Sequence, residues 1–152
     1  MQITLATPDD IGTLFDIRTG VTQNHQSRQE LAALGVTAER LAEMLQTRSR
    51  AWLAHVDGAA AGFSMADSAR ATVFALFVRP GFEGRGIGRR LMAEAEDWLF
   101  GQGWDQIWLA TGGDESLRAL GFYGHLGWVP AGVLDDGQIR FVKRQPGPLM
   151  PG

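Results

Sequence analysis

The chain of 152 residues contains no cysteine. That absence excludes disulfides, thiolate zinc sites and cysteine nucleophiles together. No apolar stretch approaches the roughly 18 residues needed to cross a bilayer, and the N-terminus "MQITLATPDD" lacks the basic and apolar regions of a signal peptide. We therefore expect a cytoplasmic protein without a membrane partner.

A basic surplus is also missing, because 14 Lys and Arg face 17 Asp and Glu, for a net charge of −3. General nucleic-acid binders usually carry excess positive charge, so we expect no nucleic-acid partner. The length and the 45% hydrophobic content are typical of one domain with one substantial core. We expect that domain over residues 1–144 and a disordered Pro/Gly-rich tail, "QPGPLMPG", over 145–152.

The first half of the chain changes from helical to strand-like spacing. "QITLAT" alternates like a strand, and Thr7 with Pro8 after it predicts a helix start. The polar run "TQNHQSRQE" interrupts that helix after about residue 21, and a second helix should begin near Thr37. "AWLAHV" and "AAGFSMA" read as strands joined by a hairpin turn at Asp57-Gly58. The continuously apolar "ATVFALFV" predicts a central strand.

The second half predicts a helix over about 87–99, a buried strand "QIWLAT", and a short helix over "ESLRALGFYGHL" opened by Asp114 and ended by Gly127. "WVPAGVL" and "QIRFVK" then predict a closing hairpin. This order favours an α/β fold of the α+β type, a mixed and mostly antiparallel sheet of about six to seven strands flanked by about four helices.

The glycine-rich stretch "PGFEGRGIGRRL", residues 80–91, lies between the central strand and a helix. Unpaired amides at a helix N-terminus bind anions, and glycines let a phosphate approach them. From the glycines alone, a tight turn with a basic rim is an equal alternative. A P-loop is excluded because Ile87 and Gly88 stand where Lys and Ser/Thr are required. A Rossmann site is disfavoured because the preceding strands form antiparallel hairpins.

Two motifs in this order resemble the GNAT-type N-acetyltransferases. "EGRGIG" matches the family's [QR]-x-x-G-x-[GA] loop from Gly86 onward, and "ALGFYGHLGW" matches A-x-x-x-Y-x-x-x-G-[FW]. The resemblance covers nearly the whole chain and implies acetyl-CoA as co-substrate, with no metal. It implies main-chain contacts to the pantetheine arm and amide contacts to the pyrophosphate, carried over as Leu76, Phe77, Val78 and as Gly84, Arg85, Gly86, Ile87, Gly88, Arg89.

The resemblance also assigns catalytic roles. Tyr123 would protonate the leaving thiolate, which suits a phenol of pKa ~10 beside a thiol of pKa ~8.5. A main-chain N–H near Leu76 to Val78 would stabilise the oxyanion. Many relatives carry a glutamate as general base where this chain has Thr72, so His25 is our candidate replacement. A solvent-facing His25, with water relaying the proton, is the competing interpretation.

Three positions depart from the family pattern. Glu83 replaces Gln or Arg and puts a negative charge near the phosphates, while Ser116 replaces an Asn and either bonds the cofactor or starts the helix. With Thr72, these departures keep a non-catalytic acyl-CoA sensor or interaction module as the alternative to direct acetyl transfer. The acceptor, a small-molecule amine or a peptide, should be selected by residues 21–29 and 134–137. A homodimer is an open expectation of the resemblance.

Overall fold

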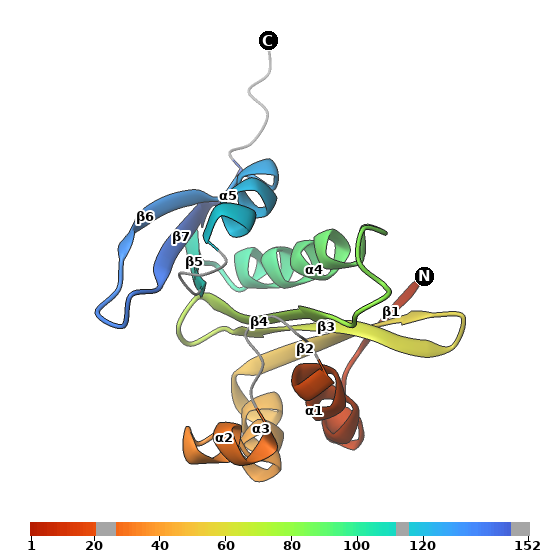
Figure 1. The fold of residues 1–152 in the computed structure, drawn as a ribbon. Helices are drawn as coiled ribbons and strands as arrows, with labels where there is room; N and C mark the ends of the chain where they lie inside the picture. Colours follow the sequence, from red (N-terminus) through yellow and green to blue (C-terminus); the bar gives the residue numbers. More distant parts are fainter. Residues whose placement is uncertain (21–26, 112–115, 147–152) are drawn as a thin grey trace.

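Seven strands form one sheet, with helices on both of its faces (Figure 1). The structure is a computed structural model that describes residues 1–20, 27–111 and 116–146, and of residues 116–119 only the backbone. Part of the expected tail, residues 147–152, and the expected helix cap Asp114 lie outside the described residues. Of the expected tail, Gln145 is described, and it donates its N–H to the carbonyl of Asp105 at 2.8 Å.

The sheet has the order β1-β2-β3-β4-β5-β7-β6, and every neighbouring pair is antiparallel except β4 with β5. The strands are β1 (Gln2–Leu5), β2 (Ser49–Val56), β3 (Ala59–Asp67), β4 (Thr72–Val78), β5 (Gln106–Thr111), β6 (Val129–Val133) and β7 (Ile139–Arg144). The helices are α1 (Ile11–Gly20), α2 (Arg28–Ala33), α3 (Ala38–Thr47), α4 (Ile87–Gly101) and α5 (Ser116–His125), with a 3-10 turn at Pro8–Asp10. The predicted α+β class and the mostly antiparallel sheet are confirmed.

The helix α2 was missed by the sequence prediction, which treated its start as part of a polar interruption. Its signal was present as a capping box, Ser-x-x-Glu. The Ser27 hydroxyl accepts the N–H of Glu30 at 3.1 Å, and the Glu30 carboxylate accepts the N–H of Ser27 at 3.2 Å. Those two bonds satisfy donors that a helix start otherwise leaves unpaired, so a six-residue helix forms despite its polar entry.

Two hydrophobic clusters lie on opposite faces of the sheet. One is built around α4, with Leu91, Met92 and Leu99, and the other around α1 and α3. Strand β4 contributes to both because its successive side chains point to opposite faces. A β-bulge falls at Phe74, between the pairs Met65–Ala75 and Ala66–Val73. The extra residue shifts the alternation, and Phe74 is left 41% exposed.

The sheet divides between β4 and β5, which are paired at one position, Thr72 with Trp108. The Thr72 hydroxyl donates to the Trp108 carbonyl at 2.8 Å, and the Trp108 N–H donates to the carbonyl of Ala71 at 3.0 Å. Beyond this point β5 continues with β7 along its whole length, from Gln106 to Thr111. Among the residues that the structure describes, the rest of β4 therefore has a strand on one side only.

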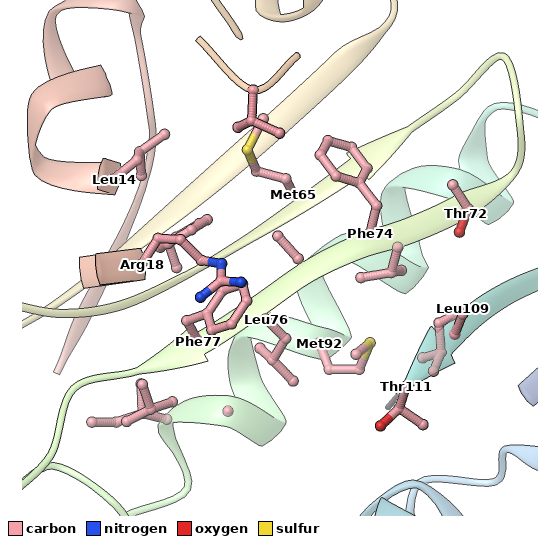
Figure 2. Close-up of a pocket in the computed structure, with 18 of the residues that line it drawn as sticks. Leu14, Arg18, Met65, Thr72, Phe74, Leu76, Phe77, Met92, Leu109 and Thr111 are labelled. Carbon is pink, nitrogen blue, oxygen red and sulfur yellow. The ribbon is translucent and has the colours of Figure 1, made fainter. Parts of the chain in front are cut away.

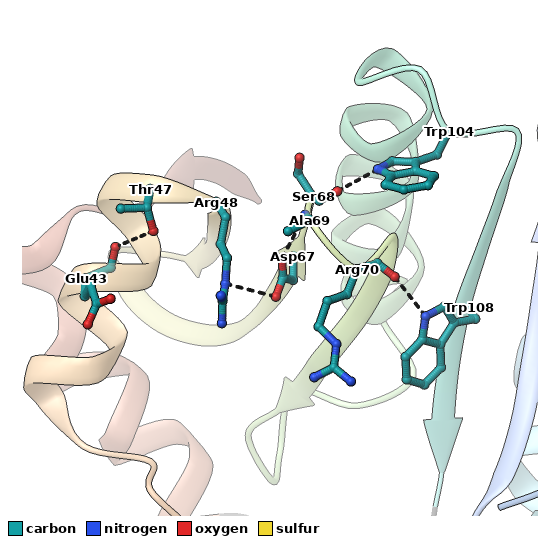
Figure 3. Close-up of polar contacts among 9 residues, drawn as sticks. All are labelled: Glu43, Thr47, Arg48, Asp67, Ser68, Ala69, Arg70, Trp104 and Trp108. Atoms are coloured by element: carbon teal, nitrogen blue, oxygen red, sulfur yellow. Dashed lines mark hydrogen bonds and ion pairs between the residues drawn. The ribbon is translucent and has the colours of Figure 1, made fainter.

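The turn from β3 to β4 is held from several directions (Figure 3). The Trp104 indole N–H donates to the Ser68 carbonyl at 2.6 Å, and the Trp108 indole N–H donates to the Arg70 carbonyl at 2.9 Å. On the other side, the Asp67 carboxylate accepts the N–H of Ala69 at 2.9 Å and pairs with Arg48 at 3.3 Å. These contacts fix the point where β4 starts and where the sheet divides.

Candidate active site

A cavity of about 930 Å³ follows β4 through the division of the sheet. One half is lined by α1, α2, α3 and β3, and the other by the loop after β4, the first turn of α4, β5 and α5. Figure 2 shows Phe77 and Leu76 on β4 and Leu109 and Thr111 on β5 as parts of this lining. The cavity is thus open to both faces of the sheet, which suits two substrates that meet at β4.

The glycine-rich loop forms the end of the cavity at the start of α4. Gly81, Gly84 and Gly86 have φ values of 92°, 75° and 77°, a region that side chains disfavour, and a Cβ on each would meet no atom within 4 Å. Gly86 directly precedes the 15-residue helix α4, whose first amides have no acceptor within the helix. Main-chain donors, the helix dipole and the exposed Arg89 make this end of the cavity suitable for phosphate groups.

The main chain of β4 offers hydrogen-bonding groups to the other end of this half. Arg79 donates its N–H to Ala61 on β3 at 2.8 Å, and groups alternate between neighbours along a strand. The main-chain N–H and C=O groups of Phe77 therefore also face β3, whereas those of Leu76 and Val78 face the gap toward β5. The structure distinguishes these two residues from Phe77, whose ring instead lines the half of the cavity beside α1.

Helix α5 approaches the loop closely through the second glycine of the predicted motif. A Cβ on Gly88 would lie 3.5 Å from the Phe122 ring and 3.7 Å from the Val78 side chain. Next to Phe122, the half-buried Tyr123 lines the cavity, with its ring centroid 5.0 Å from that of Phe122 and 5.4 Å from that of Phe141. The strand, the loop and the tyrosine therefore meet in one place.

Most of the predicted site residues line this one cavity. Those that do are Leu76, Phe77, Val78, Gly84, Gly86, Ile87, Gly88, Arg89 and Tyr123. Arg85 instead extends over the ring of Phe82, 5.4 Å from its centroid, and Glu83 is exposed at the loop's edge of the cavity. His25 and the side chain of Ser116 lie outside the described residues, although α5 begins at Ser116.

Two predictions on the remaining positions can be followed further. The hydroxyl of Thr72 donates to the carbonyl of Trp108, and Thr72 is 5% exposed. This position therefore holds the pairing of β4 with β5. The turn over residues 134–137 contributes its neighbour Gln138 to the lining. Of the segment 21–29, residues 21–26 lie outside the described residues.

Sequence reasoning missed the other half of the cavity, which holds Arg18, Arg40, Arg70 and the bulged Phe74. No motif marks these residues, because they come from four separate places: α1, α3, the turn before β4 and β4 itself. Only the spacing of Leu14 and Arg18, one helical turn apart, places two of the lining residues on one face of α1. Among the residues that the structure describes, no group of acidic, histidine or cysteine side chains could hold a metal ion. In the same residues no helix has the length and apolarity to span a membrane.

The sheet is therefore divided between two parallel strands, with the glycine-rich loop and the N-terminus of α4 at the division. The model of the acetyltransferase (GNAT) family matches residues 14–128. The chain belongs to this family, which confirms the resemblance read from the two motifs and the expected acyltransferase class.

Individual relatives agree with this assignment. A mycothiol acetyltransferase from Beutenbergia cavernae is 38% identical over 87 residues, covering 54% of this chain and 29% of that protein. The chain thus spans less than a third of that relative. The PaiA N-acetyltransferase of Thermoplasma acidophilum in complex with coenzyme A has a TM-score of 0.76 at 18% identity, over 95% of this chain and 100% of the other. YncA of Salmonella typhimurium with acetyl-CoA gives 0.75 at 16% identity, over 100% and 98%.

Proposed function

We propose that the protein transfers the acetyl group of acetyl-CoA directly to a primary amine. One observation carries the proposal: the gap between β4 and β5 brings the main chain of Leu76 and Val78, the loop amides and Tyr123 to one cavity. Structures of the same fold have coenzyme A or acetyl-CoA bound, which supports the choice of acyl donor.

The residues present fit this co-substrate. The first amides of α4 and the open, left-handed glycines of the loop would hold the pyrophosphate, and Arg89 adds positive charge. The free edge of β4 would bond the pantetheine amides as a further strand would. Because this cradle is mostly main chain, the departure at Glu83 changes the charge around it without removing a donor.

The chemistry needs an unprotonated amine, a donor for the oxyanion and a proton for the thiolate. The amine nitrogen attacks the thioester carbonyl, a C–N bond forms, the C–S bond breaks, and the amine releases a proton. A main-chain N–H of β4 that faces the gap, at Leu76 or Val78, would stabilise the oxyanion. Tyr123 would donate the proton that the leaving sulfur takes up. His25 remains our candidate for the base that accepts the amine proton.

The first experiment measures thiol release from acetyl-CoA across a panel of amines and peptides. Acceptor-dependent release with an acetylated product supports direct transfer. Binding of acetyl-CoA without release for any acceptor supports the sensor alternative. Comparison of the pH-rate profiles of the wild type and His25→Ala tests the base, since an unchanged acidic limb would remove His25 from the mechanism.

Tyr123→Phe deletes one hydroxyl and keeps the aromatic packing against Phe122 and Phe141. We expect kcat to fall about 100-fold, the lower end for general acid catalysis, with the Kd of acetyl-CoA changed less than about threefold. The matched control is Thr47→Val, which deletes an exposed hydroxyl that donates to the Glu43 carbonyl on α3, and it should leave both constants unchanged. Equal losses in kcat and in affinity for Tyr123→Phe would contradict a role as proton donor.

A further inference from the structure

The charges that line the cavity differ in sign from the charge of the whole chain. The chain carries −3, yet the described lining residues include four arginines, Arg18, Arg40, Arg70 and Arg89, and one acid, Glu83. Arg89 and Glu83 belong to the glycine-loop half, where phosphates would bind. Of the other three arginines, Arg18 and Arg40 come from α1 and α3, and Arg70 comes from the turn before β4; no carboxylate is among the described lining residues of these segments.

These three arginines approach from separate elements. The Arg18 guanidinium reaches from α1 over the ring of Phe77, 4.4 Å from its centroid (Figure 2). Arg40 is in the first turn of α3. Arg70 is in the turn before β4, and its carbonyl accepts the indole N–H of Trp108 at 2.9 Å. That hydrogen bond fixes the backbone of Arg70 at the edge of the cavity. Such an arrangement attracts an anion and repels a polycation.

The rest of the cavity half beside α1 and α3 is apolar and partly uncovered. Phe74 and Leu34 are 41% and 68% exposed although both line the cavity, and Phe63, Met65 and Phe77 lie at its floor. Figure 2 shows Phe74 rising from β4 on the same side as Met65. An apolar body bound here would cover apolar side chains that water otherwise contacts, which favours binding.

From this combination we infer the class of acceptor: a primary amine with an apolar body and a carboxylate, such as a free hydrophobic amino acid. The inference rests on the proposed acetyl transfer at the same cavity. The arginines would pair with the carboxylate and the apolar side chains would contact the body. Positive charge nearby also disfavours the ammonium form of the acceptor, and so favours the neutral amine that attacks the thioester.

Binding and turnover are measured with matched probes. N-acetyl-phenylalanine and N-acetyl-phenylalaninamide, titrated calorimetrically in the presence of coenzyme A, differ only in the carboxylate. Since a hydrogen bond to a charged group contributes about 1.5–3 kcal/mol, we expect the carboxylate to bind roughly 10- to 100-fold more tightly. In the thiol-release assay phenylalanine should be acetylated in preference to phenylalaninamide and to spermidine.

Three variants, Arg18→Gln, Arg40→Gln and Arg70→Gln, locate the group that meets the carboxylate. At least one should reduce the carboxylate preference about tenfold while leaving binding of the amide unchanged. The control Arg50→Gln neutralises an arginine on the opposite face, where Arg50 contacts Trp98 with a centroid distance of 5.3 Å. It should leave the preference intact.

The inference is overturned if the amide or spermidine is bound or acetylated as well as the carboxylate, or if all three cavity variants keep the wild-type preference. Release of thiol with polycations alone would leave the proposed acetyl transfer standing and remove the acceptor class. Carboxylate-dependent binding without any turnover would keep the ligand class and refute the transferase.

Discussion

Glu96 is a buried acid on α4 whose removal should destabilise the protein strongly. Its side chain is 9% exposed, and its two carboxylate oxygens accept from the Lys143 ammonium at 2.5 Å and from the Trp128 indole N–H at 2.9 Å. Lys143 also donates to the carbonyl of Leu126 at 2.6 Å, just after α5. One carboxylate therefore joins α4, β7 and the segment that follows α5.

Substitution Glu96→Ala would leave two donors without their acceptor. The buried Trp128 N–H costs about 1–3 kcal/mol when unsatisfied, and breaking a buried ion pair from one side costs about 3–5 kcal/mol. Lys143 is 18% exposed and keeps its bond to Leu126, which puts its share below that range. We expect a total loss of about 3–5 kcal/mol, or a fall in Tm of roughly 6–20 °C for a domain of this size.

The assay is guanidinium unfolding followed by tryptophan fluorescence and by circular dichroism, with coincident transitions and an unchanged m-value as conditions. The matched control is the double variant Glu96→Leu/Lys143→Met, which replaces the pair with apolar groups of similar size. It should recover at least about 1 kcal/mol relative to Glu96→Ala, because no buried charge is left unpaired. A loss below about 1 kcal/mol in the single variant, or an equal loss in both, would refute the reasoning.

Three further predictions concern β3 where it packs on β4, and the glycine-rich loop after β4. Gly62→Ala should cost about 2 kcal/mol or more by denaturant unfolding, because its Cβ would stand 2.7 Å from the Phe77 carbonyl oxygen; wild-type stability would show that β4 can move away. Gly86→Ala should weaken acetyl-CoA binding and lower stability by about 1 kcal/mol, because the φ of 77° at this position disfavours a side chain. Gly88→Ala should keep both the affinity and the stability, because its Cβ would meet only ordinary van der Waals contacts. Calorimetry that ranks the two variants in reverse contradicts this prediction. Glu83→Gln should tighten acetyl-CoA binding a few-fold at low salt and less at high salt, whereas salt-independent affinity would mean that Glu83 does not act through its charge.

Local patterns predicted several turns and helix ends well. The positive φ values at Asp57 and Gly58, 52° and 81°, and the left-handed Gly127 at 90° confirm the expected hairpin and helix end. The start of α3 after Thr37 is also confirmed, since the Thr37 hydroxyl accepts the Arg40 N–H at 3.2 Å. In each case the physical cause lies within a few residues, so it can be read along the chain.

The half of the cavity beside α1 and α3 was not predictable, because the contacts that form it join residues far apart in the chain. The division of the sheet depends on a single pairing, Thr72 with Trp108, between residues 36 apart in the chain. The bulge at Phe74 depends on register against β3, which the alternation of one strand does not specify. The arginines that give the cavity its local charge come from three elements, so a sum over the whole sequence hides them.

The unpaired edge of β4 also has a consequence for how this protein tolerates mutation. The N–H and C=O groups of Leu76 and Val78 belong to the peptide backbone; among ordinary substitutions only proline removes the N–H, and none removes the C=O. An alanine scan of β4 would consequently report packing losses and pass over the main-chain contacts that we propose for the acyl donor. Replacement of a single amide by an ester, substitution by proline, or an insertion that shifts the register of the strand would reach these groups, whereas other side-chain substitutions would leave them in place.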